Sequence, residues 1–171
     1  GALPTLVWHE DEPLAHPSSV ALNFVSRLAA ERVKVVLTGE GSDELFAGYE
    51  RYGHYLWNSG WMKRYGFVPA PFRTLVRNQI ATNGLLSGNF RRKLKHTFLG
   101  RENTYESLQL DNFYGAFAGD EFRSICRVPG DPYANYMRYF RAASDRSTLA
   151  QMLYADSKTY LVELLMKQDQ M

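Results

Sequence analysis

The segment 38–49 combines acidic side chains and glycines in a pattern that could hold a metal ion. Glu40, Asp43 and Glu44 lie within five positions, and a glycine stands on each side of Glu40. Glycines let a backbone turn sharply and approach a ligand closely. Neighbouring carboxylates repel one another, and dense oxygen ligands are what Mg²⁺ prefers, usually together with substrate phosphates. Metal-assisted chemistry on a phosphate-bearing ligand is therefore one interpretation of the segment.

A structural interpretation of part of this segment is equally open. Ser42 is a natural helix N-cap, and Asp43 and Glu44 are favoured by the helix dipole in a first helical turn. Glu40 is harder to explain in this way, because it lies before the helix begins. The segment is not a Walker P-loop, since no Gly-Lys-Ser/Thr follows, and it lacks the G-x-G-x-x-G dinucleotide spacing.

The elements around the acidic segment indicate an α/β fold. Residues 33–38 are short, rich in β-branched side chains and followed by glycine, which predicts a buried strand. The spacing of apolar residues over 17–32 predicts an amphipathic helix before this strand, and another helix is expected from about Asp43. This order is typical of a parallel, doubly wound sheet, in which ligands bind at the carboxyl ends of the strands. The acidic segment occupies that position.

The rest of the chain is predicted to be helical. Helical stretches are expected near residues 71–81, 90–99, 133–143 and 149–166, with glycines and prolines between them. We therefore divide the chain into residues 1–50, part of a nucleotide-binding α/β domain, and residues 51–171, a mainly helical continuation.

The composition excludes several classes of protein. The chain has 20 Lys and Arg against 18 Asp and Glu, a formal net charge of +2, which argues against a dedicated nucleic-acid binder. No apolar run approaches the roughly 20 residues that cross a bilayer, and residues 1–13 hold acids and prolines where a signal peptide would be apolar. The single cysteine, Cys126, fits a reducing compartment. We expect a cytoplasmic protein without a membrane partner.

Two basic features have both a functional and a structural interpretation. Lys167 could contact phosphates as a point charge, or it could pair with Glu163 on a helix surface. The run 90–96 holds Arg91, Arg92, Lys93 and Lys95, and such runs are usually the solvated face of a helix.

Three strings carry a resemblance to a known family. Residues 35–49, Val-Val-Leu-Thr-Gly-Glu-Gly-Ser-Asp-Glu-Leu-Phe-Ala-Gly-Tyr, closely resemble the signature of glutamine-dependent asparagine synthetases. Residues 8–13 and 17–19 look like the segment that precedes this signature. The tail 156–169, which contains Asp156, Tyr160-Leu161 and Leu165-Met166-Lys167, looks like the helix that leads into the next substrate-binding stretch. Residues 50–145 match only loosely.

The resemblance implies a synthetase domain with the ATP-pyrophosphatase fold, which is adenine nucleotide alpha hydrolase-like. ATP would adenylate aspartate, and ammonia from a glutaminase domain, supplied from glutamine, would displace AMP. By position in the motif, Asp43 looks like a ligand to the Mg²⁺ that neutralises pyrophosphate. Glu40 resembles the residue near the aspartyl-adenylate, where it could orient the substrate amine or accept a proton. Gly39 and Gly41 would allow close backbone approach, with Ser42 as the cap; the resemblance leaves a homodimer open.

Other motifs of the family do not occur in these residues. The Ser-Gly-Gly-x-Asp-Ser pyrophosphate loop and the N-terminal cysteine of the glutaminase domain are not found. We therefore expect an internal fragment without synthetase activity of its own. Two alternatives stay open: another adenylating amidotransferase of the same superfamily, either β-lactam synthetase-like or peptide- or polysaccharide-modifying, and a non-catalytic helical interaction module.

Overall fold

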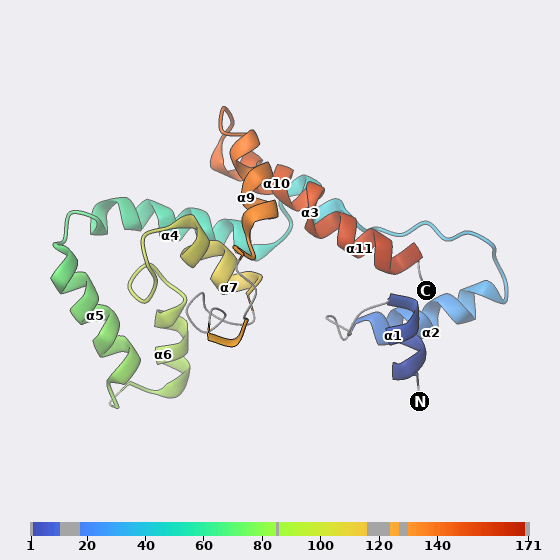
Figure 1. Cartoon of the computed structure of the whole chain (residues 1–171), viewed down its shortest axis with the longest axis horizontal. Helices are drawn as coiled ribbons and strands as arrows, with labels where there is room; N and C mark the ends of the chain where they lie inside the picture. Colours follow the sequence, from blue (N-terminus) through green and yellow to red (C-terminus); the bar gives the residue numbers. More distant parts are fainter. Residues whose placement is uncertain (1, 11–17, 85, 116–123, 127–129, 170–171) are drawn as a thin grey trace. The chain divides into compact units, whose positions relative to one another are not determined.

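The structure, a computed structural model, describes residues 2–10, 18–84, 86–115, 124–126 and 130–169. Every regular element among these residues is a helix (Figure 1). The chain divides into two compact units: unit 1 comprises residues 1–48 and 136–171, and unit 2 comprises residues 49–135. The predicted division at residue 50 separates a nucleotide-binding domain from its helical continuation. The two compact units are defined by contacts between residues and do not test that division, which stays a prediction.

Unit 1 is built from short helices that pack in pairs. Its helices are α1 (Leu3–Glu10), α2 (Ser18–Ala30), α3 (Ser42–Phe46), most of α9 (Ala134–Ala142), α10 (Thr148–Lys158) and α11 (Tyr160–Asp169). Helix α1 packs on α2, while α10 packs on both α3 and α11 (Figure 1). The predicted helix over 149–166 is two helices, because Thr159 leaves the helical conformation with φ −128° and ψ −77°.

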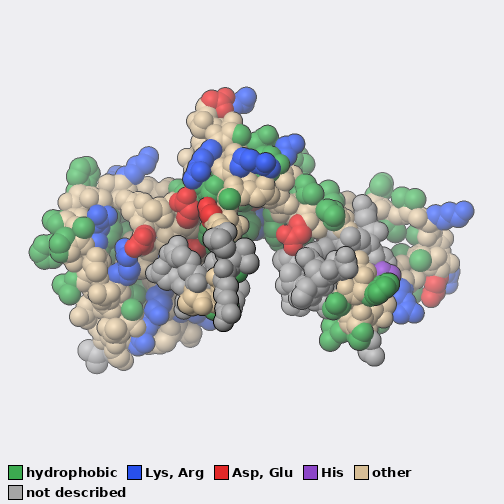
Figure 2. All heavy atoms as spheres, in the orientation of Figure 1, with side chains coloured by type: hydrophobic (Ala, Val, Ile, Leu, Met, Phe, Trp, Pro, Cys, Tyr) green, Lys and Arg blue, Asp and Glu red, His purple; other side chains and the backbone are tan. Residues whose placement is uncertain are grey.

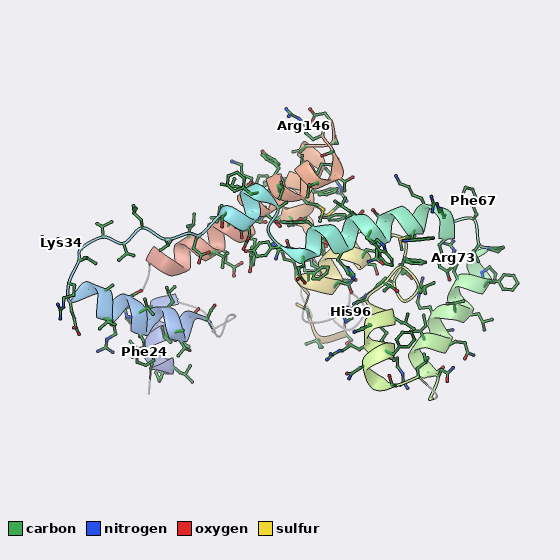
Figure 3. All side chains as sticks on the ribbon, turned by 180° about the vertical axis from the view of Figure 1, so that it is seen from behind. Phe24, Lys34, Phe67, Arg73, His96 and Arg146 are labelled. Atoms are coloured by element: carbon green, nitrogen blue, oxygen red, sulfur yellow. The ribbon has the colours of Figure 1, made fainter. Side chains whose placement is uncertain are left out.

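Unit 2 contains the longest helix described. Its elements are α4 (Glu50–Tyr65), α5 (Ala70–Thr82), α6 (Gly88–Lys95), the π-helix η1 (Glu106–Leu110) and α7 (Asp111–Phe113). Helix α4 packs on η1, and α5 packs on α6. The predicted helices near 71–81 and 90–99 are confirmed, although α6 ends at Lys95. Apolar side chains are exposed at the corner between α4 and α5 (Figure 2), where Phe67 is 89% exposed (Figure 3).

Residues 33–38 differ from the predicted strand. They form an extended segment without strand pairing, and all six are exposed, Leu37 to 95%. Lys34 lies on this segment, which leads from α2 to α3 (Figure 3). A strand is held by hydrogen bonds to a neighbouring strand, and the described residues include no other strand. The parallel sheet therefore stays a prediction.

Helix α2 forms where it was predicted, but its apolar stripe faces outward. Phe24 (Figure 3), Val25 and Leu28 are exposed. Ser19 and Asn23, on the same helix, are buried. Periodicity identifies an amphipathic helix but cannot say which face finds a partner. Within the described ranges, no helix combines the length and the apolar character needed to cross a membrane.

Candidate functional site

The acidic segment forms a single helical turn between two left-handed residues. Gly41 precedes α3 with φ 93° and ψ −10°, and Ala47 follows it with φ 60° and ψ 40°. The Gly48 N–H donates to the Asp43 carbonyl at 3.1 Å and closes the turn. A Cβ on Gly41 would lie 3.4 Å from both Cδ atoms of Leu161, so α11 packs directly against this glycine. The backbone of the segment is thus fixed by its own geometry and by α11.

Ser42 does not act as the N-cap that the sequence predicted. The cap position belongs to Gly41, and no side chain caps α3. Ser42 is the first residue of the helix, and its hydroxyl donates to the Gly39 carbonyl at 3.1 Å. The prediction failed because a left-handed glycine can begin a helix without a side-chain acceptor. Ser42 instead ties the helix back to the loop before it.

Asp43 is exposed, and the glycine at position 48 makes room for it. A Cβ added to Gly48 would collide with the Asp43 carboxylate at Oδ1, and it would also lie 2.9 Å from Cγ. Any side chain at position 48 would therefore displace that carboxylate. Sequence reasoning did not single out Gly48; the only signal was a further glycine five residues after Asp43.

Glu44 is separated from the other acids of the turn by burial. Its side chain is 1% exposed, and Asp156 of α10, the helix on which α3 packs, is fully buried. On α10, Asp156 lies one helical turn after Met152 and directly after Ala155, and all three residues are fully buried. This burial supports a structural role for Glu44. The role is packing inside the unit and not capping of a helix. The sequence analysis used Asp156 only as part of the tail motif. Its position among apolar residues of a predicted helix was a signal that it would be buried.

Glu40 lies just before the helical turn that holds Asp43. Glu40 is exposed and directly precedes Gly41, and Gly39 has open space around its α-carbon. Lys167 belongs to α11, but its side chain lies outside what the structure describes. Asp11 and Glu12, which precede Pro13, also lie outside the described residues. The structure thus brings together Gly39, Glu40, Gly41, Ser42 and Asp43, whose chemical roles stay predictions.

The donor set of the turn suits a metal ion that is shared with a ligand. In the described part of the chain, no three His, Cys, Asp or Glu side chains could hold a metal by themselves. Mg²⁺ is usually bound by one or two carboxylates together with substrate phosphates and waters. Exposed Asp43, with Glu40 in the same turn, fits that arrangement.

Unit 2 holds a second group of titratable side chains around His54 and His96. Burial lowers the pKa of His54, and the nearby charge of His96 lowers it further. The His96 ring hydrogen-bonds to Asn112 Oδ1 at 2.9 Å, and burial, followed by a hydrogen bond to Asp111, raises the pKa of Tyr133. These polar atoms are satisfied by neighbours within the unit, which indicates a structural role.

A comparison with protein families decides the relationship. The family model described as asparagine synthase matches residues 1–171. This chain belongs to the asparagine synthase family. The resemblance drawn from the signature is thus confirmed, and the family's domain is of the ATP-pyrophosphatase type.

Two bacterial relatives of this asparagine synthase family member are named asparagine synthetases, and a fungal relative is named an amidase. A putative asparagine synthetase [glutamine-hydrolyzing] of Mycobacterium tuberculosis H37Rv is 36% identical over 134 residues, 75% of this chain and 18% of the relative. Asparagine synthetase [glutamine-hydrolyzing] 1 of Bacillus subtilis is 28% identical over 179 residues, 99% of this chain and 26% of the relative. Amidase chyE of Penicillium rubens is 48% identical over 52 residues, 27% of this chain and 7% of the relative. The chain thus spans a quarter or less of the length of most of these relatives, and no solved structure matches it.

Proposed function

We propose that this chain carries part of the synthetase site of an ATP-dependent, glutamine-hydrolysing asparagine synthetase. Membership of the family and the names of the two bacterial relatives support this function. The structural observation that carries it is the exposed Asp43 carboxylate, which is held in a fixed turn over Gly48. Exposed acids on rigid backbone are what a phosphate-bearing substrate and its metal ion require.

The proposed reaction has two steps. An oxygen of the aspartate side chain attacks the α-phosphorus of ATP, and the bond to pyrophosphate breaks to leave aspartyl-adenylate. Ammonia, released from glutamine by a glutaminase domain, then attacks the acyl carbon. The carbon–oxygen bond to AMP breaks, the nitrogen loses a proton, and asparagine is formed.

The residues of the turn divide the work in this proposal. Asp43 would hold Mg²⁺, which when bound supplies positive charge to the pyrophosphate leaving group. Glu40 would orient the substrate amine or accept the proton that the attacking nitrogen loses. Gly39 and Gly41 would let the backbone approach the substrate closely. Ser42 would keep the loop in place through its bond to Gly39.

Several further features belong to the same proposal. Lys167 would contact phosphate oxygens from α11 as a point charge. Residues 33–38 would form a strand of a doubly wound parallel sheet, so that the acidic turn follows its carboxyl end. The enzyme would work in the cytoplasm on small molecules, and a homodimer is compatible with it.

The metal-ligand role of Asp43 can be tested in the full-length protein encoded by the gene. Aspartate-dependent exchange of labelled pyrophosphate into ATP measures adenylation alone. We expect Asp43→Asn to reduce this exchange at least about a hundredfold, because even residues that only support a metal ligand cost ten- to a hundredfold. Asp145→Asn, at an exposed acid that pairs with Arg146 at 3.1 Å, serves as the matched control. Exchange within a few-fold of wild type in Asp43→Asn would refute the assignment.

Gly48→Ala tests the same carboxylate through its position. The added Cβ collides with Asp43 Oδ1, and displacing a reacting group by about 1 Å can cost a hundredfold. We expect exchange to fall about ten- to a hundredfold while the charge of the turn is unchanged. Gly60→Ala is the control, because a Cβ there meets nothing within 4 Å.

A second candidate function is amide formation on another carboxylate. The Penicillium relative, 48% identical over 52 residues, is named an amidase and not an asparagine synthetase. Such an enzyme would share the adenylation step and differ in the acid that it activates. Exchange assays with aspartate, glutamate and larger carboxylic acids separate the two functions, since only one acid should drive exchange efficiently.

A further inference from the structure

The chain contains a long stretch that is rich in cations and free of acids. From Arg51 to Arg101 the sequence has 10 Lys and Arg and no Asp or Glu. This stretch covers most of α4, all of α5 and α6, and the loop after α6. The near-neutral charge of the whole chain conceals this asymmetry, because the balancing acids lie elsewhere in the sequence.

Helix α6 exposes three of its four cations to solvent, and the fourth ties the helix to the connection from α5. The Arg91 guanidinium turns inward and donates to the carbonyls of Asn83 at 2.7 Å and Leu86 at 3.3 Å, which locks the connection between α5 and α6. Arg92, Lys93 and Lys95 are exposed, and no acid in the described residues pairs with them. Figure 2 shows Lys and Arg side chains gathered over α5 and α6.

The arginines beside α6 are half-buried and help to hold the surface together. Arg77 pairs with Glu102 at 2.9 Å and also donates to the Arg101 carbonyl at 3.5 Å. The Nε atoms of Arg73, Arg77 and Arg101 are buried and find no acceptor among the described residues. These Nε atoms are shielded from an approaching ligand, so carboxylates would be attracted instead by the exposed cations Arg92, Lys93 and Lys95.

The neighbouring side chains favour a protein ligand over nucleic acid or membrane. Trp61 stacks on Phe98 with ring centres 6.3 Å apart, and Trp57 also packs on Phe98, so Phe98 covers part of each tryptophan ring and leaves less of it for stacking on bases. On α5 and α6 the large apolar side chains exposed in the described residues are Phe72, Leu75 and Phe90, fewer than the continuous apolar face with which an amphipathic helix enters a bilayer. Arginine and aromatic residues, in contrast, are enriched at protein interfaces.

We propose that the surface formed by α5, α6 and the loop to Arg101, the basic surface, binds an acidic segment of a partner protein. Charge complementarity steers the encounter, and the exposed cations of α6 pair with the partner's carboxylates. This interaction does not depend on the synthetase reaction, because none of its residues belongs to the acidic turn.

Fluorescence anisotropy of a labelled peptide of alternating Glu and Asp tests the proposal on the 171-residue chain. We expect saturable binding that weakens with added salt. The triple variant Arg92→Glu, Lys93→Glu, Lys95→Glu should weaken it by more than about tenfold, because like charges then face the peptide. The control, Arg27→Glu, Arg32→Glu, Lys34→Glu, makes the same change of charge at exposed positions of unit 1 and should change binding less than about twofold.

Three results would overturn the proposal. Equal loss of binding in both triple variants would show that net charge alone attracts the peptide. Tighter binding of a single-stranded RNA or of vesicles containing phosphatidylserine would assign the surface to nucleic acid or membrane. If the wild-type chain shows no saturable binding of the peptide, the basic surface does not bind acidic segments and the proposal is wrong. Circular dichroism of each variant is the control that checks whether its helices are retained.

Discussion

The acidic turn and the packing of α4 on η1 use polar side chains in opposite ways. In the turn, Asp43 is exposed on backbone that two left-handed residues hold in place. In the core of unit 2, Asn58 is fully buried; its Nδ2 donates to the His54 carbonyl at 2.8 Å, and its Oδ1 accepts from the Phe98 N–H at 2.9 Å. The Asp43 carboxylate stays exposed to solvent, whereas the Asn58 amide makes its hydrogen bonds inside the fold.

This difference separates functional candidates from structural ones. A buried polar group that meets its own hydrogen-bonding needs stabilises the fold and has nothing left for a ligand. A carboxylate on fixed backbone, with a glycine that leaves room for it, is available for chemistry. The comparison predicts that substitutions in the core change stability and that substitutions in the turn act mainly on activity.

The largest effect on stability is expected at Asn58. In Asn58→Ala the Phe98 N–H and the His54 carbonyl both lose a partner and a cavity remains, so the free energy of unfolding should fall by about 3 kcal/mol. Urea unfolding followed by circular dichroism measures this change. Asn78→Ala, at an exposed site of α5, is the matched control and should stay within about 0.5 kcal/mol of wild type. A loss below about 1 kcal/mol at Asn58 would contradict its structural role.

Substitution of Gln109 in η1 should change the free energy of unfolding by a smaller amount, and in the stabilising direction. Its side chain is fully buried, and neither Oε1 nor Nε2 has a hydrogen-bond partner in the structure. Gln109→Leu keeps a similar volume and removes two unsatisfied groups, so the free energy of unfolding should rise by about 1–2 kcal/mol. Thermal unfolding of the variant measures the gain. A decrease in stability would show instead that the amide binds a buried water or another ligand.

The local features of both regions could be predicted from the sequence to different extents. Helices near 71–81 and 133–143 were predicted because apolar spacing and proline breaks are local signals. Residues 33–38 were predicted as a strand, but a strand depends on neighbours that local sequence does not specify. The π-helix at Glu106–Leu110 was missed, since its extra residue per turn leaves no clear mark on hydrophobic spacing.

The site itself was predicted in part. The signature predicted a helix from about Asp43 with Glu40 before it, and α3 begins at Ser42, while the chemical roles of Glu40 and Asp43 stay predictions. The sequence did not reveal that Gly41 would replace Ser42 as the cap, because cap preference is a statistical tendency and φ depends on how α11 packs. Nor could it show that Glu44 faces inward while Asp43 faces outward, since both suit a first helical turn.

The smallest predicted effect lies at Ala47, in the turn. Among the described residues it alone has a positive φ without being glycine, and the left-handed conformation costs a residue with a Cβ about 1 kcal/mol or more. Ala47→Gly removes this cost but adds chain entropy to the unfolded state, so the free energy of unfolding should rise by about 0.5 kcal/mol. Ala21→Gly, at an exposed position inside α2, should instead lose about 1 kcal/mol. If pyrophosphate exchange by the full-length Ala47→Gly variant falls while its stability rises, the strained residue serves to hold Asp43 in position. If both rise together, the strain contributes nothing to the site, and the contrast between turn and core would then rest on Asp43 and Gly48 alone.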